Sequence, residues 1–179
     1  MEHIYQEFNE WFDYQNLYRR MVEIHDSGAK FVELGSLRGA SGSFMAVEIA
    51  NSGKAIDFHC VDHWLDESVY QEFLKNTKPV SAYMTSHRLE SGEAAKLFEP
   101  ESIDFLFIDA GHDYHEVKRD IDLWLPLMKP NGIISGHDYQ MDSPGVIQAV
   151  IEAFPNSARR TDVFSWVVQL KDGKPVKNL

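Results

Sequence analysis

The chain has 179 residues, of which 44% are hydrophobic, and it carries a formal net charge of −11. This length suits one globular domain with a sizeable core rather than two, and the composition is that of an ordinary soluble protein. The acidic balance argues against a nucleic-acid backbone as the main partner, because binding to phosphates needs a basic surface. It favours a small neutral or cationic substrate.

The chain has one cysteine, Cys60, which excludes an intramolecular disulfide and favours a cytosolic protein. The N-terminus lacks the basic start and apolar core of a signal peptide, and no apolar run approaches the length of a membrane span. We therefore expect a cytoplasmic protein without a membrane partner, with residues 1–179 forming one domain.

Apolar side chains recur at helical spacing over residues 4–26, which predicts a helix with a break near Asp13. Many of these side chains are aromatic, and two interpretations stay open. Either residues 1–28 form a helical segment that packs on the domain, or part of this segment also covers the functional site or forms a dimer contact.

Residues 31–34 predict a short strand, which a turn containing Gly35 and Gly39 joins to a helix from about residue 42 to 51. Strand, glycine turn and helix form the first unit of nucleotide-binding sheets. In a dinucleotide fingerprint the middle glycine lets the backbone approach a pyrophosphate. Leu37 stands at that position and would obstruct this approach, so the turn favours a nucleoside cofactor without a diphosphate.

A second strand, over residues 56–61, ends on Asp62. This acid follows the glycine turn by roughly 20 residues, the spacing at which an acidic side chain binds ribose hydroxyls in such folds. The next aromatic residue, Trp64, has two open interpretations, contact with an adenine or a place in the core. Further along, we predict a helix over residues 67–76, a strand within 81–88 and a helix from Ser91, as its N-cap, to Phe98.

Two short apolar runs, residues 103–108 and 133–135, flank a predicted helix over 115–128 that residues 129–132 stop. Continuous apolarity indicates parallel strands that are buried on both faces. Parallel strands end at the same edge of the sheet, so Asp109 and His137-Asp138 should meet there. Buried carboxylates are costly unless they are paired or bind a metal, so this edge is a candidate site. A helix over 146–154 and one or two strands within 161–170 complete the chain, and residues 171–174 form a turn or tail.

Two motifs resemble a known family. Residues 31–41 resemble the first motif of class I S-adenosylmethionine-dependent methyltransferases, especially the catechol O-methyltransferase-like branch. Residues 103–139 are similar to small bacterial and phage methyltransferases whose fifth strand ends in Gly-His-Asp-Tyr. The likeness covers roughly residues 14–154. It implies an α/β fold, a Rossmann-like three-layer sandwich with a mostly parallel seven-stranded sheet, an antiparallel C-terminal strand and helices on both faces.

The resemblance also implies the functional residues. The residues expected to bind S-adenosyl-L-methionine are Glu33, Gly35, Ser36, Leu37, Gly39, Ser41, Asp62, His63, Trp64, Ser91 and Asp109. The expected metal ligands are Asp109, His137 and Asp138. His112 occupies the position of the lysine that serves as general base in that branch, so His112 and Asp109 are the expected catalytic residues.

His137 departs from the oxygen ligands of that branch, and an imidazole suits Mn, Fe, Ni or Zn better than Mg. The ordinary pKa of histidine lies close to neutrality, which suits His112 as a general base. We expect metal-assisted O-methylation of a small hydroxylated acceptor such as a sugar or a phenol. No sizeable insertion is present to form a cap over the substrate, so the acceptor pocket is either shallow or completed by another subunit of a homo-oligomer. Three alternatives stay open: a metal-independent methyltransferase, a nicotinamide-dependent oxidoreductase and a non-catalytic nucleoside-cofactor-binding module.

Overall fold

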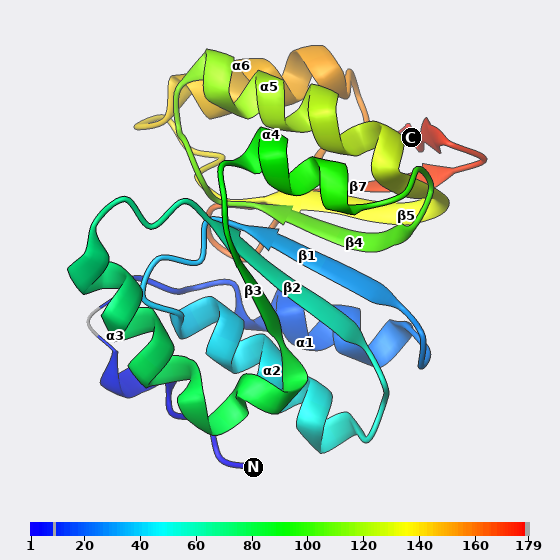
Figure 1. The fold of residues 1–179 in the computed structure, drawn as a ribbon. Coiled ribbons are helices and arrows are strands. Elements are labelled where there is room, and N and C mark those ends of the chain that lie inside the picture. Colours follow the sequence, from blue (N-terminus) through cyan, green and yellow to red (C-terminus); the bar gives the residue numbers. More distant parts are fainter. Residues whose placement is uncertain (9, 178–179) are drawn as a thin grey trace.

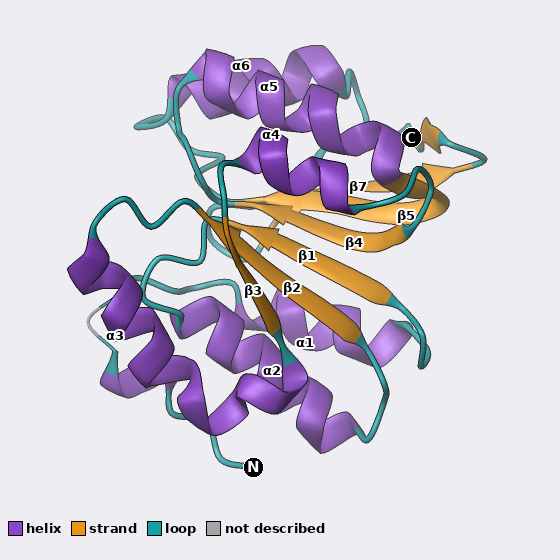
Figure 2. Ribbon diagram, in the orientation of Figure 1, coloured by secondary structure: helices purple, strands orange, loops and turns teal. Residues whose placement is uncertain are grey.

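A computed structural model of the chain describes residues 1–8 and 10–177 and has a sheet between two layers of helices (Figures 1 and 2). The strands are β1 (Lys30–Leu34), β2 (Asp57–Asp62), β3 (Thr85–Arg88), β4 (Ile103–Ile108), β5 (Met128–Gly136), β6 (Arg159–Thr161), β7 (Ser165–Lys171) and β8 (Lys174–Pro175). The α-helices are α1 (Gln15–Ile24), α2 (Ala40–Ser52), α3 (Glu67–Thr77), α4 (Ser91–Ala94), α5 (Tyr114–Trp124) and α6 (Pro144–Ala153). Short 3-10 helices lie at Tyr5–Glu7, Lys78–Tyr83, Ala95–Leu97 and Leu125–Leu127.

The strand order is β3-β2-β1-β4-β5-β7-β6, with β8 beside β7. The strands β1 to β5 pair in parallel, whereas β7 is antiparallel to β5, β6 and β8. Seven strands follow one another across the sheet within the described residues, and the two-residue β8 adds a short hairpin at the predicted turn of residues 171–174. The predicted α/β sandwich with an antiparallel C-terminal strand is therefore confirmed.

The register of the parallel strands determines where the site lies. Leu34 is opposite both Val61 and Ile108, and Ile108 is opposite Gly136, so β1, β2, β4 and β5 end at one edge. The backbone continues this pairing one residue further, because the Asp109 N–H donates to the Leu34 carbonyl at 2.8 Å and the His137 N–H to the Ile108 carbonyl at 3.0 Å. The predicted convergence of the acidic strand ends is confirmed.

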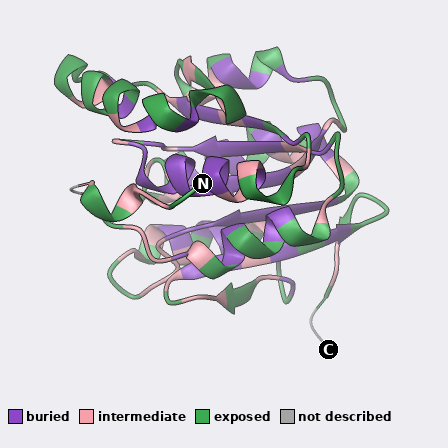
Figure 3. Cartoon of the chain, turned by 90° about the horizontal axis from the view of Figure 1, so that it is seen from below, coloured by how far each residue is buried: buried purple, intermediate pink, exposed green. Residues whose placement is uncertain are grey.

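Apolar side chains hold a helical layer on each face of the sheet. The helices α4, α5 and α6 cover one face, and α1, α2 and α3 cover the other (Figure 1). The strands are largely buried between them (Figure 3). On α1 the buried side chains are Leu17, Tyr18, Met21 and Val22, and each fully buried apolar side chain of this size stabilises the fold by about 1.5–3 kcal/mol. None of the helices in residues 1–8 and 10–177 combines the length and apolarity that a bilayer crossing requires.

Two predicted boundaries were wrong. The helix predicted to reach residue 128 ends at Trp124, because Pro126 lacks an N–H and starts a 3-10 turn. Residues 129–132 are therefore extended and belong to β5 instead of stopping a helix. The predicted break near Asp13 is wider than expected, since α1 begins at Gln15 and the only other helical residues before it, in the described part, are Tyr5–Glu7.

Candidate active site

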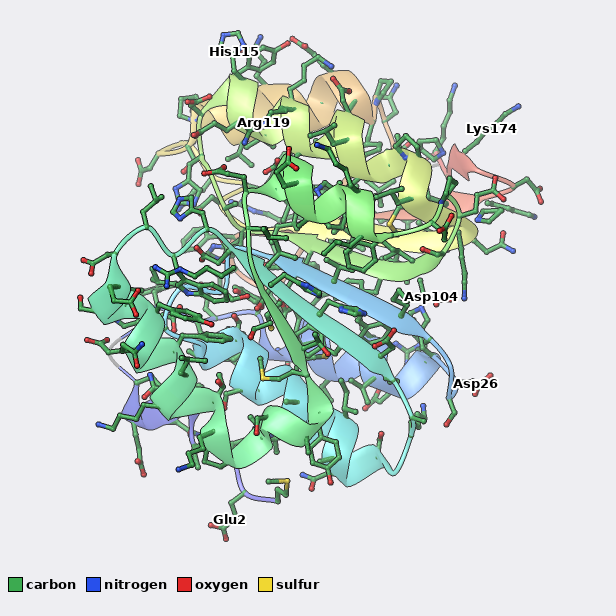
Figure 4. The ribbon with its side chains drawn as sticks, in the orientation of Figure 1. Glu2, Asp26, Asp104, His115, Arg119 and Lys174 are labelled. Carbon is green, nitrogen blue, oxygen red and sulfur yellow. The ribbon has the colours of Figure 1, made fainter. Side chains whose placement is uncertain are left out.

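A cavity of about 630 Å³ opens at the carboxyl edge of the parallel strands, a size typical of small-molecule sites. The predicted site residues that line it are Gly35, Leu37, Ser41, Asp62, His63, Ser91, Asp109, His112, His137 and Asp138. Four other predicted cofactor residues lie outside the lining: Glu33, Ser36, Gly39 and Trp64. His115 is exposed on α5 and points away from the sheet (Figure 4).

The glycine turn is held by the acid at the end of β2. Asp62 Oδ2 accepts hydrogen bonds from the backbone N–H groups of Ser36 at 3.1 Å and Leu37 at 3.0 Å, and Oδ1 accepts one from the Trp64 N–H at 2.9 Å. Gly35 has a φ of +84°, and a Cβ at this position would lie 2.0 Å from the backbone oxygen of Asp109. Only glycine therefore lets the tips of β1 and β4 approach each other.

Glu33 and Ser36 lie buried beneath the turn and outside the lining of the cavity, and their contact with the cofactor stays a prediction. The Glu33 carboxylate accepts hydrogen bonds from Tyr18 Oη at 2.7 Å and Ser36 Oγ at 2.6 Å. Burial raises the pKa of Glu33, and the hydrogen bonds from Ser36, Ser41 and Tyr18 oppose this effect. Glu33 thus shapes the turn from below. The buried Gly39 likewise packs its backbone against Thr77 and Phe73 and not against the cavity.

Trp64 also lies in the core, so its predicted contact with an adenine is corrected. Its side chain is 2% exposed and packs against Tyr70 and Phe73, with ring centroids 5.2 and 4.3 Å away. Its Nε1–H donates to the Leu37 carbonyl at 2.7 Å. Of the two interpretations left open by the sequence, the structural one is correct, and the indole supports the rim of the turn.

The residues before α1 contribute side chains that sequence reasoning missed. Tyr14 Oη donates to Asp109 Oδ2 at 2.9 Å, and Asp13 Oδ1 lies 2.8 Å from Nε2 of His137. Glu10 lines the cavity and accepts hydrogen bonds from the backbone N–H groups of Ala40, at 2.8 Å, and Arg38, at 3.4 Å, at the start of α2. The aromatic load of this segment and its break near Asp13 were the available signals: the segment packs on the domain and also lines the cavity, whereas a dimer contact stays an open alternative.

Burial raises the pKa of Glu10 to about 7, and the nearby charge of Glu33 adds to the effect, although the hydrogen bond from Ala40 opposes it. The folded state therefore keeps the Glu10 proton over a pH range in which the unfolded chain has lost it. Stability from this group is present below about pH 4.5, the ordinary pKa, and is lost as the pH rises to about 7.

Glu10→Gln should accordingly raise the free energy of unfolding at pH 8 by about 1–3 kcal/mol, and by much less at pH 5. Urea unfolding at the two pH values measures this difference. The exposed Glu7 provides a matched control, since Glu7→Gln should have little effect at either pH. Equal gains for Glu10→Gln at pH 5 and pH 8 would contradict the assignment.

Three ligand-type residues gather at the tips of β4 and β5. Asp109, His137 and Asp138 each offer one atom, and these atoms lie within 4.8 Å of one another. Nδ1 of His137 is 3.8 Å from Asp109 Oδ1 and 3.5 Å from Asp138 Oδ2. Burial by itself lowers the pKa of His137, but hydrogen bonding to Asp138 and Asp13 and the charge of Asp109 outweigh it and raise the pKa to about 9. The hydrogen bond from His137 lowers the pKa of Asp138.

His112 stands at the mouth of the cavity with its side chain 56% exposed. Its Nε2 is 3.0 Å from Asp138 Oδ2 and 3.8 Å from Asp109 Oδ1. Hydrogen bonding to Asp109 and the charge of Asp138 raise the pKa of His112. Of the two carboxylates, that of Asp138 has the oxygen nearer to the His112 ring. The structure therefore brings the predicted base and the predicted metal ligands together.

The comparisons with known proteins agree with this geometry. Residues 32–139, more than half of the chain, match the model of a family described as a methyltransferase domain. A curated, uncharacterised protein of Sinorhizobium fredii is 27% identical over 124 residues, which make up 65% of this chain and 14% of that protein. The chain thus spans a small part of the length of that relative.

Two solved structures illustrate the shared fold. An S-adenosylmethionine-dependent O-methyltransferase of Thermotoga maritima is 12% identical and has a TM-score of 0.64, with 88% of this chain and 64% of that chain covered. A Clostridium thermocellum protein assigned as an rRNA methylase is 11% identical and has a TM-score of 0.67, with 94% and 100% covered. The family match and this fold confirm the resemblance to class I S-adenosylmethionine-dependent methyltransferases, and the chain belongs to the methyltransferase domain family.

Proposed function

We propose that this domain transfers a methyl group from S-adenosylmethionine to a hydroxyl oxygen of a small acceptor, assisted by a divalent metal. The observation that carries the proposal is the group of Asp109, His137 and Asp138 in the wall of the cavity. Two carboxylates and an imidazole on one side of an open cavity suit a divalent ion that also binds a substrate oxygen. The family match supports methyl transfer as the reaction.

In this proposal the cofactor lies along the tips of β1, β2 and β4. Ser41 lines the cavity in the first turn of α2, where the positive end of the helix dipole favours the methionine carboxylate, beside the Ala40 N–H that already donates to Glu10. Asp62 binds the ribose hydroxyls, and His63 and Ser91 flank the adenine. Gly35 and Leu37 form the floor and rim beside the sulfonium.

Asp109, His137 and Asp138 suit a metal ion because Asp13 fixes the orientation of the His137 ring. The raised pKa keeps the free imidazole charged; if a metal ion took the place of the Nδ1 proton, the remaining hydrogen would stay on Nε2, which lies 2.8 Å from Asp13. The lone pair of Nδ1 then faces Asp109 and Asp138. A carboxylate behind a ligating histidine is the common support in metal sites, and the imidazole favours Mn, Fe, Ni or Zn over Mg. When bound, such an ion lowers the pKa of a chelated hydroxyl.

The side chains of the domain would align the acceptor and remove its proton. Methyl transfer needs the acceptor oxygen, methyl carbon and sulfur in line, and such alignment contributes about 7–11 kcal/mol. Asp109, which accepts a hydrogen bond from the buried Tyr14, helps to fix the acceptor. His112 at the cavity mouth takes the proton of the acceptor hydroxyl.

A sugar or phenol fits this site better than a nucleic acid. The net charge of −11 disfavours a phosphate backbone, and the likeness to the rRNA methylase extends to the fold alone. A metal-independent transfer, with Asp138 orienting the acceptor, is the alternative. The proposal includes a single domain over residues 1–179, a cytoplasmic location and an acceptor pocket that a second copy of the chain helps to close.

The domain should bind S-adenosylhomocysteine in isothermal titration, and with added Mn²⁺ it should raise the mass of members of a panel of hydroxylated metabolites by one CH2 unit, a methyl group in place of the hydroxyl hydrogen. Excess EDTA should abolish transfer, and added metal should restore it, because the ion activates the acceptor. Absence of binding at millimolar S-adenosylhomocysteine would contradict the cofactor assignment. Transfer that survives EDTA would favour the metal-independent alternative.

A further inference from the structure

The carboxylate of Asp109 accepts a hydrogen bond from Tyr14 on one oxygen and faces two imidazoles with the other. Tyr14 Oη donates to Oδ2 at 2.9 Å, and a phenol keeps its proton at neutral pH, so it remains a donor. Oδ1 lies 3.8 Å from Nδ1 of His137 and 3.8 Å from Nε2 of His112. The Tyr14 hydroxyl therefore turns Oδ1, and not Oδ2, toward the imidazoles.

The carboxylate of Asp138 is held in a similar way. Gln140 Nε2 donates to Oδ1 at 3.1 Å, whereas Oδ2 lies 3.0 Å from Nε2 of His112 and 3.5 Å from Nδ1 of His137. In both acids an uncharged side chain binds one oxygen, and the other oxygen faces His137 in the wall of the cavity. One oxygen of each acid is thus directed to the same place.

The need for hydrogen bonds does not by itself explain this arrangement. The side chains of Asp109 and Asp138 are 20% and 17% exposed, so water could supply donors to their oxygens. The oxygens that face Nδ1 of His137 lie 3.8 and 3.5 Å from it. Atoms that bind one ion at about 2.1 Å lie at most about 4.2 Å apart, so these separations suit ligands of a single ion. Tyr14 and Gln140 add a fixed direction for each carboxylate.

We propose that Tyr14 and Gln140 are positioning residues that present Oδ1 of Asp109 and Oδ2 of Asp138 as the ligating atoms. This inference rests on the proposed metal-assisted function, since it concerns how the ligands of that metal are held. A carboxylate can bind a divalent ion through one oxygen or through both. Because each outer oxygen is engaged by its donor, each acid contributes a single oxygen. Positions on the ion then stay open for an acceptor, as catalytic metal sites require.

The test uses Co²⁺, because its binding and its visible absorption spectrum can be followed in the same titration. Tyr14→Phe and Gln140→Leu remove the two donors, and each should weaken Co²⁺ binding by about 10–100-fold. Each should also change the absorption bands, because the released oxygen can become a second ligand and alter the coordination geometry. A loss of stability alone would leave the spectrum of the bound ion unchanged.

Two matched variants remove the same kinds of donor at other places. Tyr18 Oη donates to the buried Glu33 at 2.7 Å, and Gln148 Nε2 donates to Glu152 at 2.9 Å. Both of these acids lie outside the lining of the cavity. Tyr18→Phe and Gln148→Leu should therefore keep the wild-type spectrum and a Co²⁺ affinity within about 3-fold of wild type, even if Tyr18→Phe lowers the stability of the fold.

Unchanged affinity and spectrum in Tyr14→Phe or in Gln140→Leu would overturn the role of that residue. An equal change in Tyr18→Phe would show that loss of stability, and not the direction of a carboxylate, is responsible. Phenylalanine keeps the ring that packs on Phe107 with centroids 4.4 Å apart, and Gln140→Leu, at a half-buried position, tests the inference even if Tyr14→Phe fails to fold. Lack of Co²⁺ binding by the wild-type protein would instead contradict the metal-assisted reaction of the proposed function.

Discussion

Asp138→Ala should lower methyl transfer by more than about 100-fold, because loss of even an outer support of a metal ligand costs about 10–100-fold. Asp138 supplies one of the three candidate ligand atoms and is also the closest carboxylate to His112, at 3.0 Å. Its change therefore affects both the metal and the proposed base. The turnover of a hydroxylated acceptor measures the loss, and Mn²⁺ binding followed by electron paramagnetic resonance should weaken in parallel.

Cofactor binding should survive this change, since Asp138 follows β5, whereas the residues proposed to contact the cofactor lie at the ends of β1 and β2 and in α2 and α4. The dissociation constant of S-adenosylhomocysteine should stay within about 3-fold, which is about half of one tenfold step in binding free energy. Asp138 has a φ of +55°, so alanine adds about 1–2 kcal/mol of backbone strain. Asp142→Ala, at an exposed position of the same loop, should leave turnover unchanged. Full turnover in Asp138→Ala would remove this residue from the mechanism.

Gly35→Ala should lower the free energy of unfolding by about 3 kcal/mol or more, because strain and overpacking each cost about 1–3 kcal/mol. The new Cβ would lie 2.0 Å from the backbone oxygen of Asp109 and 2.9 Å from Cα of Ala110. Both atoms belong to the backbone and move only with the tip of β4. Urea unfolding measures the loss, and metal binding should weaken as well because Asp109 has to shift.

Gly53→Ala separates the two causes. Gly53 also has a positive φ, +68°, but nothing lies within 4 Å of its ideal Cβ position. It should therefore show only the backbone cost of about 1–2 kcal/mol, and the excess at Gly35 measures the collision with β4. Equal losses at the two glycines would show that the strand tips separate easily.

The sheet could be predicted from the sequence because its strands are buried on both faces. The apolar run at 103–108 was predicted at its true length, and β4 is Ile103–Ile108. The element ends were less predictable where a proline had a local effect. The apolar spacing continued past Pro126 to Met128, but the missing N–H at Pro126 ended α5 at Trp124. Periodicity reports which face is buried and not where hydrogen bonds stop.

The residues of the candidate site also fall into those that the sequence could predict and those that it could not. Asp109, His137 and Asp138 were predictable, because strand ends are local in sequence and meet through the sheet register. Asp13 and Tyr14 were not, since they reach their partners across 124 and 95 residues of sequence. Glu33 and Trp64 were assigned to the cofactor from their motif, but their side chains turn inward. A motif gives the position of a residue and not the direction of its side chain.

The segment before α1 couples ligand binding to the docking of residues 10–14 against the rest of the domain. Glu10 contacts α2, and Asp13 and Tyr14 contact the residues directly after β5 and β4. The wall of the cavity is therefore complete only when this segment is docked. Any ligand that needs the docked wall must shift the equilibrium between docked and detached states toward docking. Amide hydrogen exchange in residues 10–14 should therefore slow when the cavity is filled, and these few amides serve as a reporter of occupancy.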